Sequence, residues 1–473
     1  MVFNSAIFLF VFLPAVVLMY HLVPGKGAKN ALLGVVSLVF YAFGGIRLLP
    51  LLLISVVVSY GFGLLLGKEG GRRKLWCTLA VICHLGMLGI FKYLDFAIVS
   101  LNGLLHLSLP LQGLALPVGI SFFTFQAISY VVDVYRDREQ CCRSFGRVLL
   151  YIAFFPRLLA GPIVRYRDAV AQLDNHPVTA GSTAWGLRRF VKGMGKKILI
   201  ADLTGAMVNE IFALEPELMS TPLAWLGAIG YCVQIYFDFS GYSDIAVGMG
   251  ALFGFRFPEN FEHPYVSRSL SEFWRRWHMT LNRWFVDYLY IPLGGSRKGE
   301  RRTAINKLIV FFFTGLWHGA GWTFIAWGMW HGLFVSLETA AKPLLVRLEK
   351  SLPGRIALRV YTLLVVILGF VMFRATTFGQ GWLVISRMFA PFASAEATLA
   401  LETILDPGRV FVLVLGILLS LPVRPMIQRW IDASPRRTAV AEPVVNVLTL
   451  VLFVVCLLCI SGSGFSPFIY FQF

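Results

Sequence analysis

The chain has 473 residues, of which 57% are hydrophobic and 14% are charged. Soluble domains seldom carry so little charge, so this composition argues against a soluble multidomain protein and favours one polytopic membrane protein. The net charge of +17 suggests nucleic acid binding, but Lys and Arg stand in short loops between apolar runs, as in the cytoplasmic loops of membrane proteins. We therefore expect lipids and no nucleic acid around the chain.

Apolar runs recur from end to end, and roughly ten of them approach the length that crosses a bilayer. They predict an all-α fold of about ten or more helices in one integral-membrane domain, 1–473. The first run, 6–23, has no cleavage site of small residues after it, so we expect a retained span rather than a signal peptide.

Basic loops at 26–29, 68–74 and 136–147 alternate with pairs of apolar segments. This pattern predicts hairpins whose loops all lie in the cytoplasm, with both termini outside. The first pair, 31–43 and 48–66, is short for two crossings, so tilt or local thinning of the bilayer would be needed.

The basic stretch 157–197 is interrupted by Pro and Gly, which favours re-entrant or interfacial structure. Further spans are expected at 223–236, 308–337, 356–372, 410–421 and 444–460.

His318 stands inside an otherwise apolar run. A helix that begins at Leu308 and rises 1.5 Å per residue would place His318 about 15 Å into the membrane, which is half the thickness of the hydrocarbon layer. An ionisable group at that depth indicates function, and a neutral imidazole is a competent general base. The alternative is a packing or helix-bridging histidine, and the glycine spacings 315/319 and 328/332 are ordinary packing signals.

A second histidine, His278, lies in a segment rich in tryptophan. Apolar residues recur there at steps of three and four, which predicts one helix over 273–288. Arg275, His278 and Asn282 would share a stripe beside the apolar face, suited to a phosphate or thioester group. His278 could equally be a hydrogen-bonding residue at the membrane interface, and we expect His331 to be structural.

Metal and nucleophile motifs are missing from the sequence. There is no H-E-x-x-H motif and no Cys/His cluster, so we expect neither a metal nor a bound cofactor. There is no G-x-S-x-G elbow and no legible Ser-His-Asp arrangement, so direct transfer is favoured over a covalent acyl-enzyme. The seven cysteines form no disulfide framework.

The runs 238–299 and 315–332 resemble the signature of the membrane-bound O-acyltransferase (MBOAT) superfamily, in particular the membrane subunits of alginate O-acetylation. Segments 116–136 and 154–168 are similar as well. The resemblance implies many helices around a central funnel or tunnel, in the bacterial inner membrane. It also implies acetyl-CoA as the cytoplasmic donor, an extracytoplasmic acetyltransferase partner, and an exported polysaccharide such as alginate as the final acceptor.

The resemblance further assigns roles to residues. It makes His318, between Trp317 and Trp322, the catalytic histidine, and His278 the second one. We also expect five residues near the histidines to bind substrate, namely Trp274, Arg275, Asn282, Trp317 and Trp322.

Other functions stay open at this point. Related subunits transfer D-alanyl groups or acetylate other polymers. A glycolipid transporter or flippase would make and break no bonds, although the charged pairs and internal repeats typical of transporters are not clear in the sequence. A scaffold that only recruits a soluble acetyltransferase would be insensitive to loss of His318.

Overall fold

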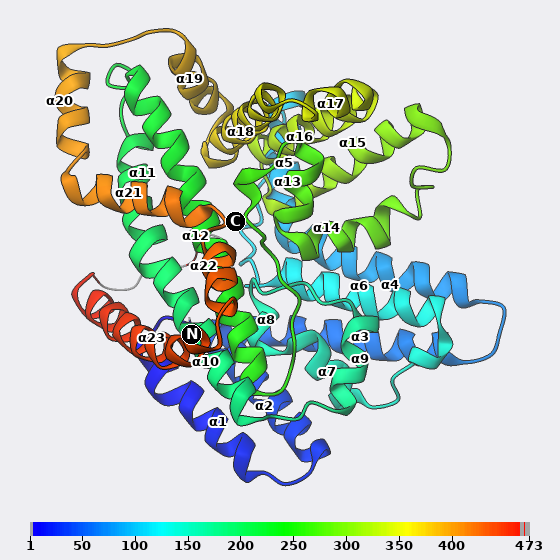
Figure 1. Cartoon of the computed structure of the whole chain (residues 1–473). Coiled ribbons are helices and arrows are strands. Elements are labelled where there is room, and N and C mark those ends of the chain that lie inside the picture. The colour runs from blue at the N-terminus through cyan, green and yellow to red at the C-terminus, as the bar shows by residue number, and fades with distance from the viewer. Residues whose placement is uncertain (1–2, 464–467, 469–473) are drawn as a thin grey trace. The chain divides into compact units, whose positions relative to one another are not determined.

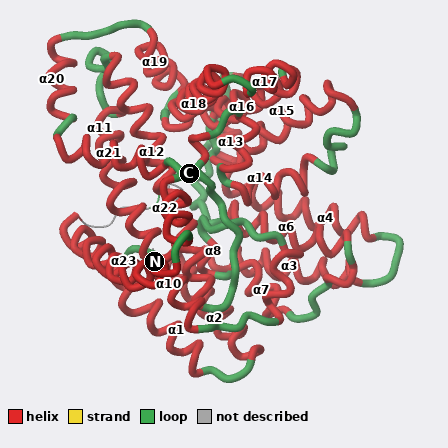
Figure 2. Tube along the Cα trace, in the orientation of Figure 1, coloured by secondary structure: helices red, strands yellow, loops and turns green. Residues whose placement is uncertain are grey.

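The computed structural model describes residues 3–463 and 468. Within them the chain is helical, with no β-strand, and loops and turns join the helices (Figures 1 and 2). The predicted all-α class is therefore confirmed. By packing, the chain divides into two compact units, residues 1–190 with 243–258 and residues 191–242 with 259–473.

The first unit is built from short helices around α6. Its elements are η1 Phe8–Phe12, α1 Leu13–Leu22, α2 Lys26–Gly45, η2 Ile46–Leu48, α3 Leu49–Gly67, α4 Arg73–Leu88, η3 Gly89–Tyr93, α5 Leu94–Leu105, α6 Ile120–Arg136, η4 Arg138–Gln140, α7 Phe145–Ala153, α8 Phe155–Leu158 and α9 Tyr166–Asp174. Helix α6 is buried along nearly its whole length and packs against α3 and α4. Helices α8 and α9, which follow α7, are short, and Gly161 and Pro162 lie between them.

The predicted hairpin of 31–43 and 48–66 is wrong. Helices α2 and α3 are separated only by the 3₁₀ turn η2, and together they form one candidate span, Lys26–Gly67, of 42 residues. Helix α2 packs mainly against α7, whereas α3 packs mainly against α6 and also contacts α7.

The boundary between the units falls inside α10 Ala180–Gly195 and α12 Thr221–Leu252. The other elements of the second unit are η5 Lys196–Asp202, α11 Leu203–Phe212, η6 Pro264–Val266, α13 Leu270–Arg276, α14 Met279–Phe285, η7 Val286–Tyr290, α15 Gly299–His318, α16 Trp322–Ala340, α17 Lys342–Glu349, α18 Leu352–Arg374, α19 Phe378–Phe389, α20 Ala395–Ile404, α21 Pro407–Ser420, α22 Val423–Asp432 and α23 Pro435–Ser463.

The predicted span 308–337 is two helices rather than one. Helix α15 ends at His318, three residues follow, and α16 runs back along it (Figure 1). The legs meet at Gly315 and Gly328, where an added Cβ would lie 2.3 Å from a carbonyl oxygen of the opposite leg. Only glycine allows the two backbones to come this close, so the expected packing through small residues is confirmed. His318, the last residue of α15, lies at the apex of the hairpin.

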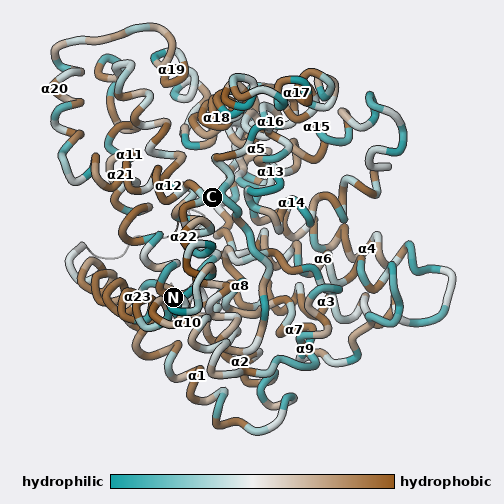
Figure 3. Tube along the Cα trace, viewed as in Figure 1, coloured by the Kyte–Doolittle hydropathy of each residue, from teal (hydrophilic) through white to brown (hydrophobic). Residues whose placement is uncertain are grey.

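Both ends of this hairpin are basic. The loop before α15 carries Arg297 and Lys298 and is hydrophilic in Figure 3, and α17 begins with Lys342. By the charge rule both ends belong on one side of the membrane, which suits a chain that enters and returns.

Fewer helices could span a membrane than the apolar runs suggested. Among the described residues, four are long and apolar enough, namely Lys26–Gly67, Arg73–Leu105, Leu352–Arg374 and Pro435–Gly462. A fifth is possible if α20 and α21, which are bent by 72°, count together. The last of the four lies in α23, the red helix of Figure 1, and only 6% of its apolar segment is buried. The predicted spans 356–372 and 444–460 fall inside α18 and α23.

Candidate active site

His318 is the last residue of α15, and the helix stops there without strain. The following Gly319 has an extended backbone, with φ −164°, and its N–H donates to Gly315 O at 3.4 Å. The side chain of His318 is buried, with 3% exposed. The hairpin therefore holds the imidazole at a fixed point inside the second unit.

His278 lies at a break in the helix that we expected over 273–288. Helix α13 ends at Arg276, and α14 begins at Met279. His278 takes the left-handed conformation between them, with φ 43° and ψ 52°. The continuous stripe of Arg275, His278 and Asn282 is therefore wrong, because a left-handed residue turns the chain out of the helical path.

Asn260 holds the break in place. Its Oδ1 accepts from Thr280 N at 3.1 Å and from Thr280 Oγ1 at 2.9 Å, and lies 3.2 Å from His278 Nδ1. Its backbone O accepts from Met279 N at 2.9 Å. One buried amide thus fixes both the first turn of α14 and the ring of His278.

The two histidines, 40 residues apart in the sequence, meet in the fold. Their ring centroids are 6.4 Å apart, and Trp317 lies against both, at 6.0 Å from His278 and 5.0 Å from His318. His278 is fully buried. The structure therefore brings His278, Trp317 and His318 together.

Aromatic rings complete the surroundings of the pair. Trp327 of α16 and Phe373 of α18 lie 5.0 Å and 5.3 Å from the ring of His318, edge to face. Phe239 of α12 lies 4.5 Å from the ring of His278. Such an apolar setting strengthens electrostatic and proton-transfer interactions inside it.

Residues 140–376 match the family model of MBOAT, the membrane-bound O-acyltransferase family. The chain is 38% identical to the probable alginate O-acetylase AlgI of Azotobacter vinelandii, over 100% of both chains. The chain belongs to the membrane-bound O-acyltransferase family. The paired histidines and the hairpin all lie within the matched residues.

Other relatives of this acyltransferase act on different polymers. It is 38% identical to the peptidoglycan O-acetyltransferase of Helicobacter pylori, over 72% of its own length and 71% of that protein. It is 30% identical to the teichoic acid D-alanyltransferase of Bacillus subtilis, over 46% of its own length and 58% of that protein. The shared property is acyl transfer, so the protein is an acyltransferase.

The other residues that were predicted to bind substrate lie in different surroundings from one another. Trp274 is buried, and its Nε1 donates to His331 Nδ1 at 3.3 Å. Asn282 donates to Trp274 O at 3.0 Å, which ties α14 to α13. Arg275 is exposed, and Trp322, at the start of α16, is 60% exposed, so neither faces the buried pair as Trp317 does.

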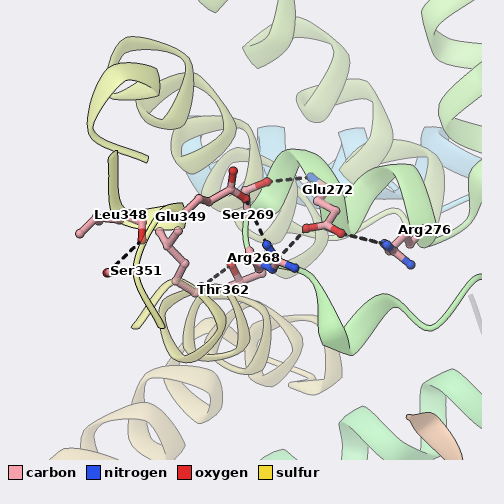
Figure 4. Close-up of polar contacts among 9 residues, drawn as sticks. Arg268, Ser269, Glu272, Arg276, Leu348, Glu349, Ser351 and Thr362 are labelled. Carbon is pink, nitrogen blue, oxygen red and sulfur yellow. Dashed lines mark hydrogen bonds and ion pairs between the residues drawn. The ribbon is translucent and has the colours of Figure 1, made fainter. Parts of the chain in front are cut away.

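The start of α13 is fixed by two carboxylates. Ser269 Oγ accepts from Glu272 N, and Glu272 Oε2 accepts from Arg268 N at 2.9 Å (Figure 4). The buried Glu338 of α16 accepts from the N–H groups of Leu270 and Ser271. All of these acceptors suit the positive end of a helix.

Sequence reasoning missed four residues around the site. The Ser269 to Glu272 spacing is a readable capping signal, but nothing in the sequence links Glu338 to it. Asn260, Trp327 and Phe373 likewise give no local signal of contact with the histidines.

Within the described part of the chain, no group of three or more His, Cys, Asp or Glu side chains could hold a metal ion. The expected lack of a metal stays a prediction.

Proposed function

We propose that this acyltransferase takes an acetyl group from acetyl-CoA on the cytoplasmic side and passes it outward for O-acetylation of an exported cell-surface polysaccharide such as alginate. The observation that carries the proposal is the buried pair His318 and His278 at the apex of the α15–α16 hairpin. The similarity to alginate O-acetylases over the full chain supports the acetyl group and the type of acceptor.

In this proposal His318 acts as the general base. Its imidazole takes the proton of an acceptor hydroxyl, and the oxygen attacks the carbonyl carbon of the acetyl thioester. The C–S bond breaks, the CoA thiolate leaves and takes up the proton, and the products are an O-acetyl ester and free CoA. No acyl-enzyme is formed.

The second histidine and its neighbours orient the reactants. His278 faces the same aromatic surroundings as His318, so it can hold the donor or the acceptor by a hydrogen bond. The final acceptor is reached through an extracytoplasmic acetyltransferase partner, in a bacterial inner membrane whose outer face receives both chain termini.

The test is acetyl transfer from labelled acetyl-CoA by the purified protein, measured as release of CoA thiol. His318→Gln keeps a polar side chain of similar size but removes the base, so we expect a loss of about 100-fold or more. His263→Asn is the matched control, because His263 lies in a loop with φ 45°, which asparagine tolerates.

A His318→Gln protein that inserts normally and keeps its rate would refute the catalytic role. A wild-type protein that ignores acetyl-CoA but consumes a D-alanyl thioester would favour the second candidate, D-alanyl transfer, which the similarity to a teichoic acid D-alanyltransferase supports. A wild-type protein that consumes no thioester while it moves a glycolipid would instead support the transporter.

A further inference from the structure

Helix α22, in the second unit, turns an apolar side outward. Its apolar residues recur at helical spacing and share that side, namely Val423, Met426, Ile427 and Trp430. More than half of the surface of Met426, of Ile427 and of Trp430 is exposed. Arg429 follows Met426 by three residues, so it borders the same side. The exposed face of α22 is therefore apolar with a basic edge.

The next helix, α23, shows what covers this face. Two residues join α22 to α23, which contains the candidate span Pro435–Gly462. Almost none of that segment is buried in the protein, and Figure 3 shows α23 as largely hydrophobic. A helix that is apolar on all sides and so exposed is a span surrounded by lipid. The apolar face of α22 continues that surface, and a short amphipathic helix beside a span is suited to lie in the plane of the membrane surface.

This end of the span carries an excess of positive charge. From 423 to 437 the sequence has four arginines and one acidic residue, Asp432. Three of the arginines are exposed and form no ion pair with a carboxylate of the described residues, namely Arg429, Arg436 and Arg437. Long arginine side chains at the edge of an apolar surface reach the level of the lipid phosphates. The surface therefore fits a partner that is negatively charged at that level.

Arg437 ties the two helices together at Trp430. Its Nη1 donates to Trp430 O at 3.0 Å, and its guanidinium carbon lies 4.2 Å from the centre of the Trp430 ring, in a cation–π contact. Thr438 Oγ1 also donates to Ile431 O, at 3.4 Å. Tryptophan rings are enriched at the level of the headgroups. The bend between the helices thus brings an aromatic anchor and a phosphate-binding group to the same depth.

We propose that α22 lies in the membrane surface and that Arg429, Arg436 and Arg437 bind the phosphate of an anionic phospholipid such as phosphatidylglycerol. Guanidinium groups can donate two hydrogen bonds to one phosphate. In phosphatidylcholine a trimethylammonium group accompanies the phosphate, and the arginines repel it. Each arginine near a membrane surface adds about a fivefold preference for anionic lipid. This anchoring role goes beyond the transfer of acyl groups and does not depend on it.

The test is fluorescence quenching of the purified full-length protein in vesicles of phosphatidylcholine mixed with phosphatidylglycerol. A bimane dye is attached at Met426→Cys on α22 or at Leu448→Cys, an exposed position further along α23. One of the two lipids carries a nitroxide on its acyl chain, and the vesicles are otherwise identical. We expect phosphatidylglycerol to associate with position 426 about fivefold or more better than phosphatidylcholine, and the two lipids to quench position 448 equally.

Two pairs of substitutions, made in the chain labelled on α22, test the arginines. Arg429→Gln with Arg436→Gln should lower the preference for phosphatidylglycerol to about twofold or less, with Arg437 left in place to hold the bend. Arg301→Gln with Arg302→Gln is the matched control, because it removes the same charge from an exposed pair near the start of α15. It should keep the preference.

Quenching at position 448 without quenching at position 426 would mean that water or another protein covers α22, and the proposal would fail. Equal quenching by both lipids at position 426 would leave only an apolar contact and refute the phosphate site. A preference that survives the loss of Arg429 and Arg436 would overturn it too. If that variant does not fold, high salt decides. It should lower the preference at position 426 in the chain that keeps its arginines, and an unchanged preference would refute the site.

Discussion

His278 has a left-handed backbone that residues other than glycine seldom adopt, at a cost of about 1 kcal/mol or more. This conformation persists because Asn260 ties both sides of the break, through Thr280 and through His278 itself. The consequence is a ring aimed at His318 rather than along the helix, which makes Asn260 a positioning residue.

Replacing Asn260 tests that role. Asn260→Ala removes the acceptor of two bonds from Thr280, so we expect a loss of about 1–3 kcal/mol in the free energy of unfolding. Because the ring of His278 also loses its partner, kcat for acetyl transfer should fall more than tenfold while KM changes little. Steady-state kinetics and thermal unfolding measure the two effects.

Thr280→Ser keeps the hydroxyl and the backbone N–H, so it should leave both quantities near wild type. If Asn260→Ala loses stability but keeps its kcat, the amide serves the fold alone and His278 needs no such support.

Helix α13 is too short to be stable without the groups that hold its first turn. Glu338 approaches that turn from α16, one leg of the hairpin that carries His318, and its carboxylate accepts from two consecutive N–H groups of α13. The helix that leads into His278 is thereby fastened to the hairpin that ends in His318. This link joins the two segments, remote in sequence, that carry His278 and His318.

Glu338→Ala should therefore destabilise the protein by about 2–4 kcal/mol, because it leaves buried N–H groups without acceptors. Glu338→Gln keeps one acceptor oxygen and should lose less. Chemical or thermal unfolding of the purified variants gives the comparison. Glu349→Ala is the control, since Glu349 is a half-exposed carboxylate 3.9 Å from Arg268 (Figure 4) and should change the stability by less than about 1 kcal/mol. Equal losses for Glu338→Ala and Glu349→Ala would contradict the anchoring role.

The elements show what the sequence could and could not predict. Trp274, Trp277 and Leu281, which periodicity placed on one apolar face, are buried. Periodicity gave no sign of the break at His278, because the apolar spacing continues across it. The apolar pattern predicted one span for the hairpin because the three residues of its turn are small and apolar. Such residues do not interrupt an apolar run. The meeting of His278 with His318 followed from family resemblance, since spacing carries no information on contacts between remote segments.

At the scale of the whole molecule, the apolar runs of the sequence outnumber the described helices that are long and apolar enough to cross a membrane. Apolar residues also fill buried helices such as α6 and the two legs of the α15–α16 hairpin, so an apolar run does not by itself imply a lipid-facing span. Charge is the better guide to sidedness, because it acts through the loops.

The sidedness can be measured with single cysteines on exposed positions. Glu300→Cys lies in the first turn of α15, beside basic residues, and Glu396→Cys lies in the first turn of α20, in an acidic region. In intact cells, a membrane-impermeant maleimide should label position 396 above the parent chain and should label position 300 only after the membrane is opened. The parent chain, with its own seven cysteines, sets the background. Labelling of both positions in intact cells would disprove the assignment.

The backbone contact between Gly315 and Gly328 has a further consequence for how the enzyme opens. With no side chain between the two legs, their backbones are in direct contact, which fixes the tip that carries His318 relative to α16. In the proposed mechanism a thioester would reach His318 by rotation of the rings around the tip, among them Phe373, which comes from a separate helix. The proposed base would then be the fixed part of the catalytic apparatus, and the aromatic rings around it would be the part that rearranges.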